Sequence, residues 1–163
     1  MKNKIILWSL AGLLLATIAG VALQKSWSLL FPEIHLSAPL DRACDLRAGA
    51  CVSPLPEGGS VTLSIEPRSI PVMKSLQFEV QVQGMQVNGV EIDFSGVDMN
   101  MGFNRAALEQ RQDGIFSGKG MLPVCVRDAM EWEARVLLQT DQGLVSAPYR
   151  FITVKPGMEL PVD

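Results

Sequence analysis

The sequence predicts an all-β fold for the part of the chain that follows residue 60. Apolar and polar side chains alternate with a period of two in several short segments, which is the pattern of strands with one buried face. Turn-forming residues separate these segments, and no segment has a convincing amphipathic helical period. About seven such strands are typical of a β-sandwich, and we expect an immunoglobulin-like topology over residues 60–155.

The expected strands follow one another with short turns between them. The clearest alternation places Leu76, Phe78 and Val80 on one face, with glutamine and glutamate residues between them. By the same criterion we expect strands at residues 61–66, 76–83, 90–95, 103–111, 115–122, 131–138 and 144–154.

The N-terminus is expected to be a transmembrane anchor over residues 1–24. Lys2 and Lys4 precede an uncharged run at residues 5–23. Crossing a bilayer as a helix takes about 20 residues, whereas the core of a signal peptide spans roughly 7–15. A removed signal peptide stays open as the alternative. The lysines favour a cytoplasmic N-terminus, so in a Gram-negative bacterium the rest of this single-pass inner-membrane protein would lie in the periplasm.

Residues 25–59 are expected to form a juxtamembrane linker with little regular structure, because prolines and a pair of glycines interrupt any periodic pattern. In an oxidising compartment Cys44 and Cys51, which are close in the sequence, are the natural disulfide. Cys125 is then left unpaired. A bond from Cys125 to either of the other two cysteines stays open. Residues 156–163 are expected to form a tail.

The unpaired cysteine is expected to lie near two methionines. The segment Gln112-Asp113-Gly114 predicts a three-residue hairpin loop whose glycine takes the left-handed conformation. Pairing Arg111 with Ile115 extends to a register in which Met101 faces Cys125. Over this length the register can slip by one or two residues, so we expect both side chains at the same end of one hairpin.

These sulfur atoms predict a Cu(I) site. In an extended segment Met99 and Met101 point the same way, and thioethers and thiolates are soft donors that select Cu(I). Met130 follows Cys125 by five residues and is a further candidate ligand. The alternative is that the methionines fill gaps in the core and the cysteine is a small buried apolar residue.

The sequence lacks the residues that several other classes of function need. The net charge of -3 and the pI near 5.2 argue against nucleic-acid binding. His35 is the single histidine and is expected in a surface loop. A His-based metal site or a catalytic triad is therefore not expected, and Asp93 and Asp98 are interpreted as surface and turn residues. We do not expect an enzyme.

Three motifs define a resemblance to a known family. They are residues 93–105 (DFSGVDMNMGFNR), 121–125 (MLPVC) and 130–132 (MEW), and Cys44 and Cys51 lie upstream of them. Together they resemble a family of small, membrane-anchored bacterial proteins of largely unassigned function. The architecture is also similar to FixH-like and YtkA-like exported β-sandwich domains, some of which are associated with copper handling. The resemblance implies Met99, Met101 and Cys125 as ligands.

The expected function is that of a membrane-anchored periplasmic Cu(I)-binding protein. It would pass the metal to a copper-protein partner during assembly of a respiratory oxidase. The alternative is a non-metal interaction module that presents a sheet edge or loop to another envelope protein, with its methionines as an adaptable contact surface.

Overall fold

The computed structural model describes residues 4, 8, 10, 12–22, 34–124, 126–155, 157 and 158. The chain divides into two units, Met1–Glu33 and Ile34–Asp163. Residues 12–22 are helical. In the described part of the chain, no helix has both the length and the apolar character needed to span a bilayer. The anchor expected over residues 1–24 lies partly outside the described residues and stays a prediction.

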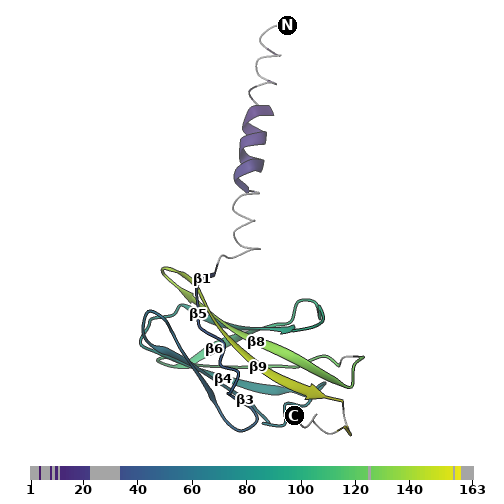
Figure 1. Ribbon diagram of the computed structural model, residues 1–163. Coiled ribbons are helices and arrows are strands. Elements are labelled where there is room, and N and C mark those ends of the chain that lie inside the picture. Colours follow the sequence, from purple (N-terminus) through teal and green to yellow (C-terminus); the bar gives the residue numbers. More distant parts are fainter. Residues whose placement is uncertain are drawn as a thin grey trace. The chain divides into compact units, whose positions relative to one another are not determined.

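The second unit is mostly β, which confirms the predicted all-β class (Figure 1). Its described residues form one continuous, mixed and strongly curled sheet with the spatial order β1-β9-β8-β5-β6-β7-β4-β3-β2. The nine strands are β1 (Ile34–Ser37), β2 (Cys51–Pro54), β3 (Ser60–Glu66), β4 (Leu76–Gln83), β5 (Gly89–Gly96), β6 (Arg105–Gln112), β7 (Ile115–Gly120), β8 (Ala129–Thr140) and β9 (Gly143–Val154).

Two of these strands fall within residues 25–59, where the sequence predicted a linker. The edge strand β1 pairs in parallel with β9. The edge strand β2 pairs antiparallel with β3. Each has four residues, which is too few to show a clear period of two. The prolines nearby also interrupt the pattern from which strands are predicted. Every strand that the alternation predicted has a counterpart in the sheet.

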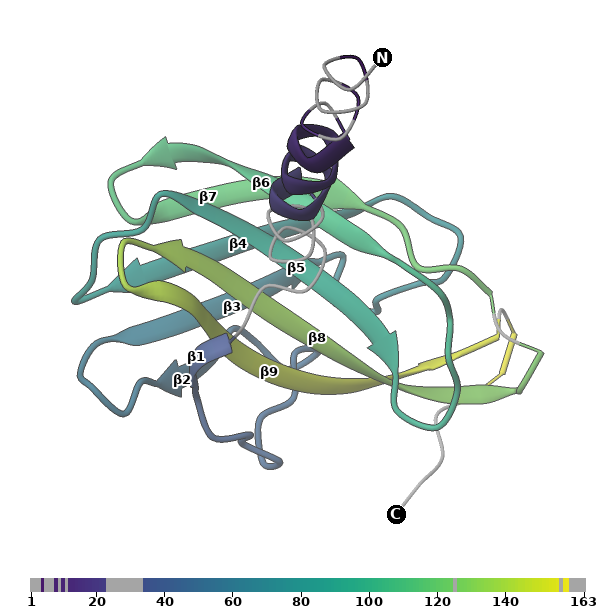
Figure 2. The same ribbon diagram turned by 90° about the horizontal axis from the view of Figure 1, so that it is seen from above.

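The sheet curls because β6 divides its pairing between two neighbours. Its first half pairs with β5, from Arg105 to Leu108, and its second half pairs with β7, from Glu109 to Gln112. The strands β5, β8 and β9 then lie side by side (Figure 2). The change of partner lets the apolar faces of the two halves of the sheet pack against each other.

The core lies between these two halves. Phe78 of β4 contacts Phe94 of β5 at a ring-centroid distance of 5.1 Å, and Phe94 contacts Phe151 of β9 at 6.5 Å. The buried Tyr149 of β9 donates a hydrogen bond of 2.7 Å from its hydroxyl to the carbonyl oxygen of Val61 on β3. The alternation that predicted the strands therefore also identified the faces that bury the apolar side chains.

The Cys44 and Cys51 sulfur atoms lie at disulfide distance, in agreement with the expected pairing, and their Cα atoms are 5.8 Å apart. Between them, the buried side chain of Leu46 belongs to the core. The disulfide therefore joins the packed loop before β2 to the first residue of that strand.

We predict a measurable pH dependence from Tyr149. Burial raises its pKa to about 12 from the ordinary value of 10.0. Since the folded state holds this proton more tightly, stability from Tyr149 is complete below pH 10 and is lost as the pH rises toward 12. The free energy of unfolding in urea should therefore fall more steeply over this window in the wild type than in Tyr149→Phe.

At neutral pH the Tyr149→Phe variant should be less stable by about 1–2 kcal/mol, because the Val61 carbonyl oxygen loses a buried donor. The role of this hydrogen bond would be contradicted if the wild type and Tyr149→Phe were equally stable both at neutral pH and over the window from pH 10 to 12.

Candidate metal centre

The predicted ligands come from three segments. Met99 and Met101 lie in residues 97–104, the loop between β5 and β6. Met130 is the second residue of β8. Cys125, in the connection between β7 and β8, lies outside the described residues, so its place relative to the methionines stays a prediction.

The hairpin predicted for this juxtaposition is paired as expected only over residues 109–110 and 116–117. Glu109 pairs with Ser117 in the predicted register, and Gly114 has the expected positive φ of 69°. Beside the turn a bulge pairs Gln112, and not Arg111, with Ile115. At its other end β6 begins at Arg105, where it pairs with β5. The prediction that the hairpin continues to Met101 is therefore wrong, because β6 changes its partner before the chain reaches that residue.

Gly96 is the point around which the three methionines meet. It is the last residue of β5 and lies opposite Trp132 of β8. A Cβ atom at Gly96 would collide with the Met130 methyl carbon and with the carbonyl oxygen of Met99, and it would lie 3.3 Å from the Met101 Cγ. The missing side chain thus leaves the space that brings these residues together.

The methionines differ in their exposure. The Met130 side chain is 7% exposed, whereas Met99 and Met101 are partly buried and pack against the core. The three residues therefore span the boundary between the core and the solvent.

Local hydrogen bonds shape the loop. The Gly102 amide donates to the Asn100 side-chain oxygen at 2.8 Å, and Gly102 has a φ of 74°. Such an Asx turn bends the backbone. At the two ends of the loop, Val97 donates to the Glu131 carbonyl oxygen and the Asn104 carbonyl oxygen accepts from β5. The methionines thus lie in a bent, anchored loop instead of the extended segment that we expected.

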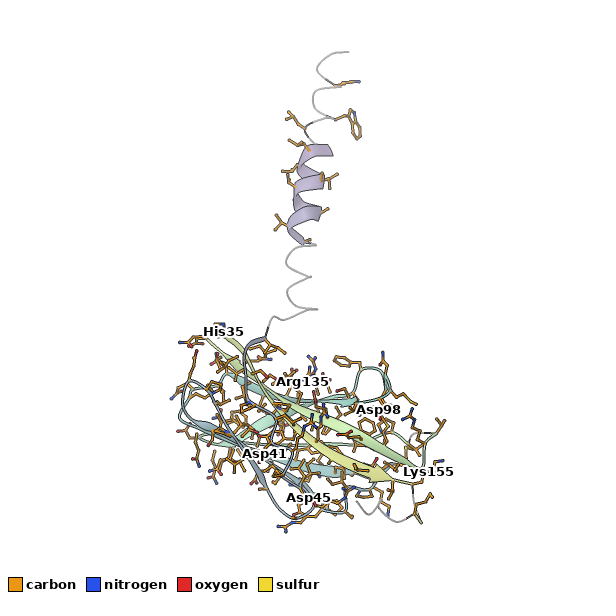
Figure 3. All side chains as sticks on the ribbon, in the orientation of Figure 1. His35, Asp41, Asp45, Asp98, Arg135 and Lys155 are labelled. Atoms are coloured by element: carbon orange, nitrogen blue, oxygen red, sulfur yellow. A yellow bond between two sulfur atoms is a disulfide. The ribbon has the colours of Figure 1, made fainter. Side chains whose placement is uncertain are left out.

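Charged contacts tie this loop to the connection that contains Cys125. Asp98 and Arg127 form an ion pair of 3.6 Å. The Lys155 Nζ donates to the Val126 carbonyl oxygen at 2.8 Å and to Asp128 at 2.9 Å. Exposed pairs contribute little stability, but they show that residues 126–128 lie beside residues 97–104. Asp98 and Lys155 accordingly lie at the same end of the domain (Figure 3).

His35 is at the other end of the domain (Figure 3). It lines a pocket with Met85 and Asp141, near the start of β5, whereas Met99 follows the end of β5. The structure therefore does not bring His35 to the methionines. Asp93, which the sequence analysis interprets as a surface residue, contacts Arg105 at 3.7 Å on the neighbouring strand.

The donor chemistry fits a soft ion. Across the described residues, no group of three or more histidine, cysteine, aspartate or glutamate side chains could hold a metal. The side chains of Met130 and Met101 reach Gly96 with carbon atoms next to their sulfur, and Met99 reaches it with its carbonyl oxygen. Thioether side chains favour Cu(I) over Zn²⁺ or Mg²⁺. The sequence signal that could have located the centre is the glycine at the start of Gly96-Val97-Asp98-Met99, which we did not interpret as a space-making residue.

Comparison of the chain with protein-family models, with curated proteins and with solved structures finds no match. The resemblances drawn from the sequence motifs accordingly stay predictions.

We predict that Gly96→Ala disrupts the cluster. The new methyl group would displace the Met130 methyl and press on the Met99 carbonyl group, and overpacking of this kind costs typically about 1–3 kcal/mol. Thermal unfolding should show a lower Tm. The control is Gly49→Ala, since Gly49 has open space where the Cβ would be; a similar loss of stability in both variants would contradict the tight packing at Gly96.

Proposed function

We propose that this protein binds Cu(I) through Met99, Met101 and Met130, with Cys125 as the thiolate ligand. The observation that supports this most is that the Met130 methyl carbon, the Met101 Cγ and the Met99 carbonyl oxygen all lie around the Cβ position of Gly96. The ion pair between Asp98 and Arg127 places the neighbours of Cys125 at the same end.

The proposed chemistry is ligand exchange. Sulfur donors stabilise the monovalent ion, and a thiolate together with two or three thioethers forms a site of low charge. Met130 is buried, whereas Met99 and Met101 belong to a loop that is half exposed. An acceptor protein can therefore approach the ion from the loop side while the buried thioether still holds it.

We place this activity outside the cytoplasm, on a membrane anchor formed by residues 1–24. The apolar run at residues 5–23 and the Cys44–Cys51 pair support that location. The curled sheet would then be an immunoglobulin-like sandwich in the periplasm of a Gram-negative bacterium. Its partner would be a copper protein or an assembly factor of a respiratory oxidase.

A protein-interaction module is the second candidate function. Phe103 is 82% exposed and Val126 is 84% exposed, and both lie in loops at the end that holds the methionines. Exposed apolar side chains that gather in one region are typical of binding surfaces. A metal-independent partner would dock there without using sulfur ligands.

Copper titration separates the two functions. We expect the full chain, reduced and in detergent, to take Cu(I) from a competing chromogenic chelator. Replacing the four ligands together (Met99→Leu, Met101→Leu, Met130→Leu and Cys125→Ser) should weaken binding by at least about a hundredfold, or about 2.7 kcal/mol. Leucine keeps the apolar volume, so circular dichroism and Tm should change little.

The matched control is Met85→Leu, because Met85 lies in the pocket beside His35 at the other end of the domain. It should bind copper like the wild type. Equal binding by the wild type and the fourfold variant would refute the copper site and favour the interaction module.

We also expect one reactive thiol per chain in denatured, non-reduced protein, because Cys44 and Cys51 lie at disulfide distance and leave Cys125 unpaired. A thiol-specific chromogenic reagent measures the count. A count of zero would mean that Cys125 is bridged to another molecule and would remove the proposed thiolate ligand.

A further inference from the structure

The strand β9 is paired along only part of its outer side, the side that faces away from β8. It pairs with β8 over its whole length, from Gly143 to Val154. On the outer side β1 pairs with residues 144–146 alone, beside the start of β9 (Figure 2). In the described part of the chain no other strand pairs with β9. The second half of β9 therefore has an open side.

Hydrogen bonds at the two ends of β9 show which residues turn their backbone groups outward. Directly after β9, the Lys155 amide donates to the Asp128 carbonyl oxygen in the register of the β8 ladder. On the side of β1, the Ala38 amide donates to the Ser146 carbonyl oxygen. In an antiparallel ladder the residues that bond to the partner strand alternate with residues that point away from it. The odd-numbered residues of β9 thus point to β8, and the even-numbered residues point outward.

Three even-numbered residues lie on the open side and have a backbone N–H group: Arg150, Ile152 and Val154. Pro148 precedes them and is also even-numbered, so its missing N–H group costs no bond to β8. The chain thus offers a short row of donors and acceptors that a further strand can use.

The residues of this row favour pairing. The last four residues of β9 are Phe-Ile-Thr-Val, which are aromatic or β-branched and are typical of strands. The charge of Arg150 is compensated within its own chain, because its guanidinium lies 3.4 Å from Glu131 and from Glu133 of β8. The half-buried Ile152 can bury further apolar surface against a partner.

A second copy of the same strand fits the open side. If two β9 strands pair antiparallel about a two-fold axis at Ile152, this residue faces its counterpart and Arg150 faces Val154. Outward-pointing residues then face one another, and each such pair exchanges two hydrogen bonds. An axis at Arg150 would bring like charges directly opposite, which is destabilising. An axis at Phe151 would pair Val154 with Pro148, which has no amide proton to donate.

We propose that this protein forms a homodimer in which the β9 strands of two copies pair antiparallel through Arg150, Ile152 and Val154. The two curled sheets then join into one. A strand pairing this short buries less than the roughly 800 Å² per partner of a standard interface. The dimer is therefore expected to be weak and to depend on protein concentration. It uses none of the methionines and needs no copper.

Cysteine cross-linking tests the register. We would introduce Ile152→Cys into the full chain in detergent, with Cys125→Ser as the background, and oxidise it mildly without copper. In the proposed dimer the two Cα atoms at this position are about 5.5 Å apart, which suits a disulfide. The matched control is Leu144→Cys, because Leu144 is half-buried on the same strand but is covered by β1. Since only Ile152→Cys brings its sulfur atoms together, it should give at least about tenfold more linked dimer.

Two variants without a new cysteine test the contact itself. Ile152→Lys places like charges opposite each other, whereas Ile152→Pro removes only an outward N–H group that β8 does not use. Sedimentation velocity over a concentration series should show dimer in the wild type and at least about fivefold less dimer in both variants. Val52→Lys, at an exposed position of the other edge strand β2, should dimerise like the wild type.

Three results would overturn the dimer. The first is a wild type that stays monomeric at every concentration. The second is equal cross-linking of Ile152→Cys and Leu144→Cys, which would reflect random collision. The third is undiminished dimer in both Ile152→Lys and Ile152→Pro, which would place the contact on another surface. If either variant unfolds, as judged by circular dichroism, the cross-linking comparison decides.

Discussion

The divided pairing of β6 is the constraint on which the rest of the domain depends. Because its first half belongs with β5 and its second half with β7, the sheet must curl. The curl brings Phe78 and Phe94 into contact and lets Tyr149 reach Val61 across the core. It also ends the β6–β7 ladder early. The loop that bears the methionines therefore folds over the end of β5 and does not continue a hairpin.

Alternation in the sequence was enough to predict the strands with a buried face. In β4, for example, buried and exposed residues alternate throughout. The same signal could not predict β1 and β2, since they are short edge strands whose partners lie far away in sequence. It also could not predict the change of partner in β6. A period of two identifies which face of a strand is buried, but it contains no information about which neighbour supplies the hydrogen bonds.

The candidate site was predictable in its chemistry and not in its geometry. The donor types of Met99, Met101 and Met130 follow directly from the sequence, and the structure gathers these residues around Gly96. The route that we expected, a continued hairpin with an extended Met-x-Met segment, was wrong. The Asx turn at Asn100 and the space above a glycine depend on backbone angles and long-range packing.

The Cys44–Cys51 pair lies at one margin of the sheet, since β2 is the last strand in the spatial order. Every open margin presents unpaired amide and carbonyl groups that can recruit strands from other molecules. At this margin β2 is only four residues long and ends in Pro54. Its first residue, Cys51, is held by the cross-link to the packed loop around Leu46. The disulfide therefore helps to guard against edge-to-edge aggregation, a hazard that grows whenever β2 detaches from the sheet.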